Sequence, residues 1–417
     1  LDPVGLVLSA GPGLSPLRSR LGSFVTVVPG GLDHRGVEVQ PLDFSGLRET
    51  VSGWHERGVN AFACVGKFSP RNPAHELAMA GEIRKAVPDA AVTLGHQLSG
   101  ELNYPRRIAT AYYNAASARL HNEFLDAVEG VLRERGISAP VFLLKVDGGA
   151  VPIGVSRRLP VQSILSGPAA SVMGVMALAG DLADGCALLF DIGGTTTDIA
   201  LFVQGSPVID RGGMCLGGRR TLVPALATLS IGVGGDSRIS VEGKGASASV
   251  EVGPLRSGPA MAFGGKDPTF LDALNVLNGD GTDRKAGDAD ASERAMAALA
   301  ARCGLETGEL ALRVWKRAVQ KISDAAAHPI YTLRELKSHK DVSADRVYLV
   351  GGPTDCLARR LSASLGLPVV PTAEADVANA VGAALTSPTS SLEIYADTGK
   401  GELLAPSLDL REPLENG

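Results

Sequence analysis

Residues 191–198 read Asp-Ile-Gly-Gly-Thr-Thr-Thr-Asp, and these residue types in this order could hold a phosphate group. Gly193 and Gly194 lack a Cβ, so their backbone N–H groups can approach an anion closely. Successive N–H groups in such a turn form an anion-binding concavity. The alternative is an ordinary β-hairpin, because many hairpins carry Asp and Gly in their turns.

The side chains around the two glycines extend this possibility. Thr195, Thr196 and Thr197 add hydroxyl donors, and Asp191 and Asp198 flank the turn with carboxylates. Mg²⁺ prefers hard oxygen ligands and keeps part of its water shell. The pattern therefore indicates a site for phosphate and Mg²⁺, with Asp191 and Asp198 as the metal-binding residues.

A second glycine pair lies at residues 351–354, Gly-Gly-Pro-Thr, between a predicted strand and a predicted helix. The first turn of a helix exposes unpaired N–H groups and a positive dipole end, which favours phosphate or lets the backbone pack on an adenine ring. Thr354 has the residue type of an N-cap. The alternative is a routine turn from strand to helix.

The elements that must position these residues follow from hydrophobic periodicity and from Gly and Pro punctuation. Predicted strands are Val4–Leu8, Ala61–Val65, Val141–Val146, Ala187–Phe190, Ile199–Val203, Arg346–Val350 and Leu367–Val370. Predicted helices are Asp43–Arg57, Asn72–Val87, Arg106–Gly136, Ala291–Arg302, Glu306–Ala327, Thr354–Leu365 and Ala373–Leu385. Residues 278–292 are predicted to form an exposed loop, and the tail from Thr386 is predicted to be loosely held. Strands that alternate with helices predict an α/β fold with parallel pairing.

Two stretches of small residues are predicted to pack closely against other helices. They run from Ser166 to Val175 and from Ala378 to Ala384. Small residues at helical spacing allow two helices to cross closely, and a crossing pair that links two lobes would form a hinge. Simple core packing explains the same composition.

Composition and charge exclude several function classes. The chain of 417 residues has 40 basic and 45 acidic side chains, a net charge of −5, which argues against nucleic acid or an anionic membrane as the main partner. No apolar run reaches the roughly 18 residues that a membrane span needs. The five cysteines form no Cys-x-x-Cys pair, which argues against a zinc knuckle or a disulfide scaffold and fits a reducing cytosol.

The order of these motifs resembles the actin, hexokinase and Hsp70-like ATPase superfamily. More narrowly, the chain resembles the A (alpha) subunit of the hydantoinase/oxoprolinase family between Asn72 and Ala384. The matching segments are His96–Ser99, Asp147–Gly149, Pro160–Ala170, Phe190–Asp198, Ile231–Ser237, Val252–Pro259, Thr269–Leu277 and Gly351–Thr354.

The resemblance implies a two-lobed, ribonuclease H-like α/β ATPase fold with an incomplete N-terminal lobe. Residues 1–165 would form that lobe, completed by 376–417, and residues 166–375 the second lobe. It also implies ATP-dependent opening of a cyclic amide, of the hydantoin or 5-oxoproline type, by phosphorylation of the carbonyl oxygen. A B-type (beta) partner subunit, an oligomeric assembly and a cytoplasmic location go with it.

The resemblance also assigns roles to particular residues, with ATP and Mg²⁺ as cofactors. Phosphate would contact Gly193, Gly194, Thr195 and Thr196, and adenosine would contact Gly351, Gly352 and Thr354. Asp191, Asp198 and Asp147 are the candidate catalytic residues, and Asp191 and Asp198 would also hold the metal.

Two departures from the family pattern keep other functions open. The family's first phosphate loop, another Asp-x-Gly-Gly-Thr turn, is absent before Asn72, and Asp236 stands where a third glycine is usual. A non-catalytic or nucleotide-regulated scaffold is therefore one alternative. A carboxylase subunit that uses the same ATP chemistry on a ketone is another.

Overall fold

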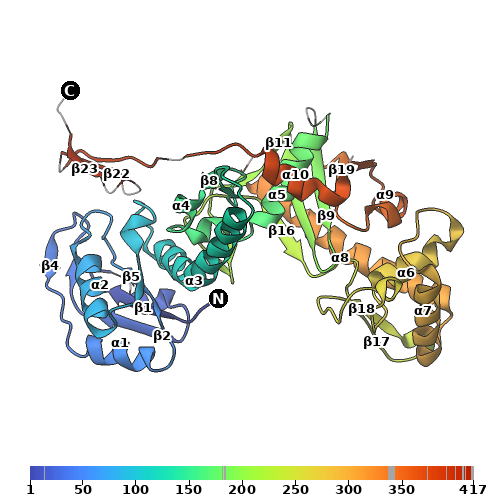
Figure 1. The fold of residues 1–417 in the computed structure, drawn as a ribbon, viewed down its shortest axis with the longest axis horizontal. Coiled ribbons are helices and arrows are strands. Elements are labelled where there is room, and N and C mark those ends of the chain that lie inside the picture. The colour runs from blue at the N-terminus through green and yellow to red at the C-terminus, as the bar shows by residue number, and fades with distance from the viewer. Residues whose placement is uncertain are drawn as a thin grey trace.

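The chain forms two lobes, each built around its own β-sheet (Figure 1). The computed structural model describes residues 1–417 apart from 14, 181, 183–184, 337–342, 373, 391, 400, 406–407, 409 and 415–417, and only the backbone of 328–336 and 371. The α/β, two-lobed architecture predicted from the sequence is confirmed. The residue boundaries proposed between the lobes stay a prediction.

The N-terminal lobe contains a four-stranded parallel sheet in the order β2-β1-β5-β6. The strands are β1 (Val4–Ser9), β2 (Phe24–Val28), β5 (Ala61–Val65) and β6 (Ala91–Leu94). Successive side chains of a strand point to opposite faces, so a strand covered on both faces is apolar throughout. Accordingly, every residue of β1 and β5 is buried.

Helices cover both faces of this sheet. On one face, α1 (Leu47–His55) and α2 (Ala74–Ala86) pack against Val7, Phe62 and Cys64. On the other face, the long helix α3 (Tyr104–Glu134) packs against Leu6 and Leu8. The lobe therefore has two apolar layers separated by one sheet.

The second lobe is organised around a six-stranded sheet in the order β11-β10-β9-β19-β20, with β16 also paired to β10. Its strands are β9 (Cys186–Ile192), β10 (Thr197–Val203), β11 (Ser206–Pro207), β16 (Thr228–Ile231), β19 (Arg346–Val350) and β20 (Val369–Pro371). The pairs of β9 with β10 and of β10 with β16 are antiparallel, whereas β19 runs parallel to β9. The carboxyl end of β19 therefore lies beside the carboxyl end of β9.

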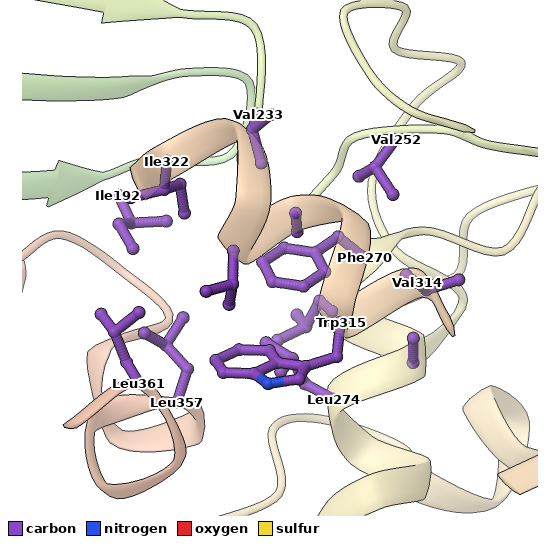
Figure 2. Packing of buried hydrophobic residues seen from close by; sticks show 14 of the residues in the cluster. Ile192, Val233, Val252, Phe270, Leu274, Val314, Trp315, Ile322, Leu357 and Leu361 are labelled. Carbon is purple, nitrogen blue, oxygen red and sulfur yellow. The ribbon is translucent and has the colours of Figure 1, made fainter. Parts of the chain in front are cut away.

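The largest core cluster lies on one face of this sheet. It joins strand residues such as Ile192 to the helices α6 (Phe270–Leu277), α7 (Ala289–Cys303) and α8 (Thr307–Leu336). Phe270 and Trp315 stack at its centre, with ring centroids 6.1 Å apart (Figure 2). This packing holds the helical layer against the strands that carry the candidate site.

The opposite face carries the two helices of small residues predicted from the sequence. Helix α5 (Ser166–Leu178) and helix α10 (Ala378–Leu385) cross in close contact. A Cβ at Gly174 would fall on the carbonyl of Ala378, and one at Gly382 on the carbonyl of Ala170. Glycine is thus required at both positions for the backbones to approach this closely.

The remaining elements are short. In the N-terminal lobe and its connections they are β3 (Gly31–Leu32), β4 (Glu38–Gln40), β7 (Phe142–Leu144), β8 (Ala150–Pro152) and α4 (Ile153–Ser156). The second lobe adds β12 (Ile209–Asp210), β13 (Cys215–Leu216), β14 (Arg219–Arg220), β15 (Ala225–Leu226), β17 (Ile239–Glu242), β18 (Ser249–Val252) and α9 (Ala358–Leu365). The short 3₁₀ helices are Pro16–Ser19, Gly95–Gln97, Pro160–Ser163, Gly245–Ser247, Met261–Phe263, Asn278–Asp280, Thr354–Cys356 and Ala375–Val377.

Most of the predicted elements are confirmed, and two strands have the predicted bounds, Ala61–Val65 and Arg346–Val350. The prediction of a loose tail is wrong: β21 (Tyr395–Asp397), β22 (Glu402–Ala405) and β23 (Leu410–Pro413) form an antiparallel sheet. Ala373, the first residue of the last predicted helix, lies outside the described residues. Of the helices that the structure describes, none combines the length and apolarity needed to cross a bilayer.

Candidate functional site

The segment 191–198 forms a tight hairpin between β9 and β10. Asp191 and Asp198 are direct cross-strand partners, so their side chains point to the same face of the sheet. Gly193 N–H donates to the carbonyl of Thr196 at 2.9 Å and closes the turn. Gly194 and Thr195 are exposed at the tip.

A second glycine-rich segment, residues 232–235, packs beneath this tip. Gly235 N–H donates to the Gly193 carbonyl at 2.9 Å, and Asp236 N–H donates to the Gly194 carbonyl at 2.6 Å. A Cβ at Gly234 would lie 2.7 Å from both of these carbonyl oxygens. The tip therefore uses its carbonyl groups to attach to the protein, and within the described part of the chain no group accepts a hydrogen bond from the N–H of Gly194 or Thr195.

The two carboxylates at the base of the hairpin are partly buried and close together. Ser171 on α5 donates a 2.5 Å hydrogen bond to Asp191 Oδ2. Burial raises the pKa of Asp191 above its ordinary value, and the Ser171 hydrogen bond opposes this. Burial also raises the pKa of Asp198; the Ser230 hydrogen bond opposes that shift and the charge of Asp191 adds to it. Two partly desolvated carboxylates side by side are unfavourable unless a cation or proton joins them.

Gly351 brings the second predicted motif against this pair. It follows β19, whose last residue Val350 pairs with Asp191. Gly351 has a φ of +104°, and a Cβ on it would lie 2.8 Å from Asp191 Oδ1 and would also strike the Ile192 carbonyl. Only glycine fits here, so the turn after β19 lies directly against the carboxylate pair.

A cavity of about 480 Å³ opens next to this turn. Its walls come from the turn after β19, from the start of α9 and from the loop after α6; the lining residues are 281–284, Leu349, Thr354, Asp355, Ala358, Arg359, Thr372 and Ala375. The Ala375 carbonyl accepts a 2.8 Å hydrogen bond from Gly351 N–H. The cavity and the carboxylate pair therefore share one supporting turn, and the volume lies in the range of small-molecule sites.

The loop 281–284 is anchored as a wall of this cavity. The Asp283 carboxylate accepts hydrogen bonds from the N–H groups of Arg359 at 2.9 Å and Arg360 at 3.0 Å, at the start of α9. Arg284 N–H donates to the Asp355 carbonyl at 3.0 Å. The sequence predicted an exposed loop over 278–292, and residues 279–288 are mostly exposed, but the loop is tied to α9 and α7 already begins at Ala289.

One polar atom of the cavity lacks a partner. The hydroxyl of Thr372 is buried and has no hydrogen bond within the described residues. Buried hydroxyl groups are normally hydrogen-bonded, so an orphaned one in a cavity wall is compatible with a polar ligand.

The predicted start of the helix Thr354–Leu365 is wrong. Residues Thr354–Cys356 form a 3₁₀ turn, α9 begins only at Ala358, and Thr354 does not act as an N-cap. The first N–H groups of α9 are occupied by Asp283, as described above. Gly352 and Thr354 therefore do not present a helix N-terminus to a ligand, although Thr354 lines the cavity.

Asp147 makes its hydrogen bonds within its own turn. Its carboxylate bonds Lys145 Nζ at 2.8 Å and Gly149 N–H at 2.9 Å. Gly148 packs against Met173 of α5, and no described contact joins Asp147 to Asp191 or Asp198. Thr197, predicted to add a hydroxyl donor, is buried and donates to the Val233 carbonyl at 2.7 Å instead.

The structure adds two site residues that the sequence did not single out as such. Ser171 was part of a small-residue helix, and nothing in its spacing pointed to Asp191. Asp236 was noted only as a departure from glycine, yet its carboxylate would lie 2.7 Å from a Cβ on Gly194. It pairs with Arg256 at 2.7 Å and accepts from Ala260 N–H at 3.1 Å, so its charge is compensated beside the tip.

The chemistry of the donor set fits Mg²⁺ in a particular way. Among the described residues, no three or more His, Cys, Asp or Glu side chains converge as a metal-binding group. Mg²⁺ is usually bound through one or two carboxylates, several waters and substrate phosphates. Asp191 and Asp198, with raised pKa values and nearby N–H groups that can donate to an anion, match that arrangement.

Comparisons with known proteins show the family and the fold of the chain. The family model described as hydantoinase/oxoprolinase matches residues 107–391, and the model of the family's N-terminal region matches residues 18–87. Caprolactamase subunit alpha from Pseudomonas jessenii is 28% identical over 247 residues, which are 58% of this chain and 35% of that protein. Acetophenone carboxylase gamma subunit from Aromatoleum aromaticum is 28% identical over 263 residues, 59% of this chain and 34% of that protein.

Solved structures share the fold across nearly the whole chain. A nucleotide-free acetone carboxylase aligns with a TM-score of 0.71 at 19% identity, covering 94% of this chain and 59% of that one. The ATP-dependent caprolactamase from Pseudomonas jessenii aligns with a TM-score of 0.67 at 22% identity, covering 94% and 60%. The chain thus spans about a third of the length of these two curated relatives and about three fifths of these structures.

Proposed function

Because the chain belongs to the hydantoinase/oxoprolinase family, we propose that it is the nucleotide-binding part of an ATP-dependent enzyme subunit that opens a cyclic amide. The substrate class would be a hydantoin or a 5-oxoproline-type lactam. Two relatives support an enzymatic role by their names: caprolactamase subunit alpha, and 5-oxoprolinase 1 from Arabidopsis thaliana, which is 26% identical over 57% of this chain and 19% of that protein.

The observation that carries the proposal is the contact of Gly351 with Asp191. Gly351 lies between Leu349 and Thr354, which line the cavity, and it also lies against Asp191 of the hairpin. The cavity is therefore close to the paired carboxylates. A nucleoside in the cavity would direct its phosphates toward the hairpin tip, where the N–H groups of Gly194 and Thr195 have no acceptor among the described residues. This order of base, phosphate and carboxylates is what nucleotide hydrolysis and transfer require.

The proposed chemistry follows from the weakness of an amide as an electrophile. The carbonyl oxygen of the lactam would attack the γ-phosphorus, and the bond from that phosphorus to the bridging oxygen would break with ADP keeping the electron pair. One water would add to the activated carbon, and the ring C–N bond would break as nitrogen keeps its electron pair and gains a proton. A second water would hydrolyse the resulting acyl phosphate.

In this scheme the chain's own residues would position Mg²⁺ and the phosphates of the nucleotide. Asp191 and Asp198 would hold Mg²⁺ and its waters, and Ser171 would fix the orientation of the Asp191 carboxylate. The N–H groups of Gly194 and Thr195 would contact phosphate oxygens, and Thr196 lies next to them. When bound, Mg²⁺ supplies neutralisation of the phosphate charge. Asp147 is retained only as a candidate at the edge of the site.

A partner subunit and a cytoplasmic location are further parts of the proposal. Two relatives are named as subunits, which supports an oligomeric assembly with a B-type partner. All five cysteines are free, which fits a reducing compartment. A carboxylase role is the second candidate, because acetone and acetophenone carboxylases are among the relatives; dependence of ATP turnover on bicarbonate and a ketone would distinguish it.

Calorimetric titration with Mg²⁺ and a non-hydrolysable ATP analogue tests the proposal. We expect the 417-residue chain to bind the analogue, and the D191N/D198N variant to bind it at least about tenfold more weakly, equivalent to about 1.4 kcal/mol or more. The variant D89N provides a matched control, because Asp89 is exposed in a turn of the N-terminal lobe.

Each outcome has a clear meaning. Equal affinity of wild type and D191N/D198N would refute the roles given to these carboxylates. Absence of binding to wild type would contradict nucleotide binding by this chain and favour the scaffold alternative.

A further inference from the structure

A second cavity, of about 250 Å³, lies where the two lobes meet. One wall is the first turn of α3 with Pro105 and Arg106, and Ser19 adjoins it. The other wall is the β13–β14 hairpin of the second lobe, with Gly218, Arg219 and Arg220. None of its residues lines the 480 Å³ cavity or belongs to the hairpin 191–198.

The charged residues that line this cavity are all basic. Three of its lining residues are arginines, Arg106, Arg219 and Arg220, and no lining residue is acidic. Arg220 is paired with Asp210 at 2.8 Å. Within the described part of the chain, the side chains of Arg106 and Arg219 make no hydrogen bond and no ion pair. Two of the arginines that line the cavity thus have no acidic partner among the described residues.

The β13–β14 hairpin is shaped to hold Arg219 at this place. Gly217 and Gly218 have φ values of +52° and +73°, the left-handed conformation of a tight two-residue turn. The tip is fastened to α3, since Tyr113 donates its hydroxyl to the Leu216 carbonyl at 2.8 Å. A Cβ on Gly217 would lie 2.8 Å from the same Tyr113 oxygen.

A second bond continues this attachment. Leu222 N–H donates to Thr110 Oγ1 at 2.9 Å, one turn along α3 from Arg106. The two walls of the cavity therefore come from different lobes but are held by hydrogen bonds on either side of the turn. A fastened hairpin loses little further backbone freedom when its side chains bind a ligand.

We propose that this cavity is a binding site for a small molecule bearing a phosphate group. Guanidinium presents a planar fork of donors that matches phosphate oxygens in paired hydrogen bonds. Phosphate has enough oxygens to engage Arg106 and Arg219 together, one from each lobe. The positive end of the 31-residue helix α3 adds to the attraction.

A ligand held in this way would link the lobes. Its phosphate would bridge α3 and the β13–β14 hairpin and would strengthen the contact already made by Tyr113 and Leu216. Because no residue is shared with the proposed nucleotide site, this inference is independent of the proposed function, and the bound molecule would act as a second ligand of the chain.

The test is titration of the full chain with inorganic phosphate and pyrophosphate, followed by calorimetry. The variant R106Q/R219Q removes the two unpaired cations. The control R294Q/R302Q removes the same charge from exposed positions of α7, where no described acid pairs with either arginine. We expect at least about tenfold weaker binding in R106Q/R219Q and unchanged binding in R294Q/R302Q.

Three results would overturn the proposal. These are equal binding by wild type and R106Q/R219Q, equal losses in both variants, or tighter binding of the dicarboxylate succinate than of pyrophosphate. Circular dichroism of each variant verifies folding, and R106Q and R219Q made singly replace the double variant if it does not fold.

Discussion

At the scale of single residues, the paired carboxylates of the hairpin are the most unusual feature of the second lobe. Asp191 and Asp198 face the same side of adjacent strands, and burial raises the pKa of both. Neither carboxylate forms an ion pair with a basic side chain of the described chain, so folding alone gains little from their charges. A cost of this kind is typical of residues retained for binding or catalysis.

We expect D191N to raise the free energy of unfolding at pH 7, by about 1 kcal/mol. The raised pKa means that the folded state binds more protons than the unfolded state just above pH 3.8, so the ionised side chain destabilises the fold as the pH rises through this range. Urea unfolding at several pH values should show the difference between wild type and variant growing as the pH rises and levelling off near neutrality.

For the exposed control D89N, the difference in unfolding free energy from wild type should not grow with pH. A D191N protein that is less stable than wild type at pH 7 would mean that the Ser171 hydrogen bond outweighs the cost of burying the charge. It would remove the argument that this carboxylate is held at the expense of stability.

At the scale of elements, the crossing of α5 and α10 fixes the wall behind the site. Helix α5 carries Ser171, which orients Asp191, and the same helix contacts α10 through Gly174. A shift of α5 at this crossing would therefore move Ser171 and change its hydrogen bond to Asp191.

We expect G174A to destabilise the second lobe by about 1–3 kcal/mol, because the new methyl group would strike the Ala378 carbonyl and force the helices apart. G308A in α8 is the matched control, since nothing outside its own helix and chain neighbours lies within 4 Å of a Cβ at Gly308. Thermal unfolding of both variants distinguishes overpacking from a general effect of alanine. Equal stabilities would show that the crossing adjusts freely.

At the scale of the whole molecule, the two tryptophans lie in different apolar clusters, while a further cluster joins α3 to residues 214–225. Trp54 packs in the N-terminal lobe, and Trp315 is buried in the second. The N-terminal lobe also has a buried polar centre at the carboxyl ends of its strands. There the fully buried Glu76 accepts hydrogen bonds from Gly66 N–H at 2.8 Å and from His96 Nδ1 at 2.6 Å.

This centre should stabilise the N-terminal lobe only. Burial raises the pKa of Glu76, but the hydrogen bond and charge of His96, with Arg107 and Ser69, outweigh it and leave the pKa below its ordinary value of 4.5. The stabilisation is thus present above pH 4.5 and is lost as the pH falls below that value.

We expect E76Q to destabilise the N-terminal lobe by about 3 kcal/mol or more, because an amide leaves some of these donors unpaired. In W315F, Trp54 fluorescence reports on that lobe, and in W54F, Trp315 reports on the other. The E76Q substitution should lower the unfolding midpoint in the W315F background and leave it nearly unchanged in the W54F background. Equal shifts in both would show that the lobes unfold as one cooperative unit.

The sequence by itself determined most of the elements and the hairpin that carries the candidate site. Strands such as Ala61–Val65 are apolar on both faces, so their extent follows from local composition. The hairpin 191–198 and the close helix pair at Gly174 and Gly382 were also predicted, because glycine pairs and small-residue spacing act over a few residues. The pairing of Asp191 with Asp198 follows from the hairpin register alone.

Only the tertiary structure decided which distant groups meet. Parallel pairing of β19 with β9 places Gly351 on Asp191, although 160 residues separate them, and the wall 281–284 comes from a further loop. In the tertiary structure Thr197 is also buried, α9 begins only at Ala358, and Asp147 is bonded to Lys145. These outcomes depend on strand order and on competition among nearby partners for the same hydrogen bonds, and neither is written in the local pattern of residues.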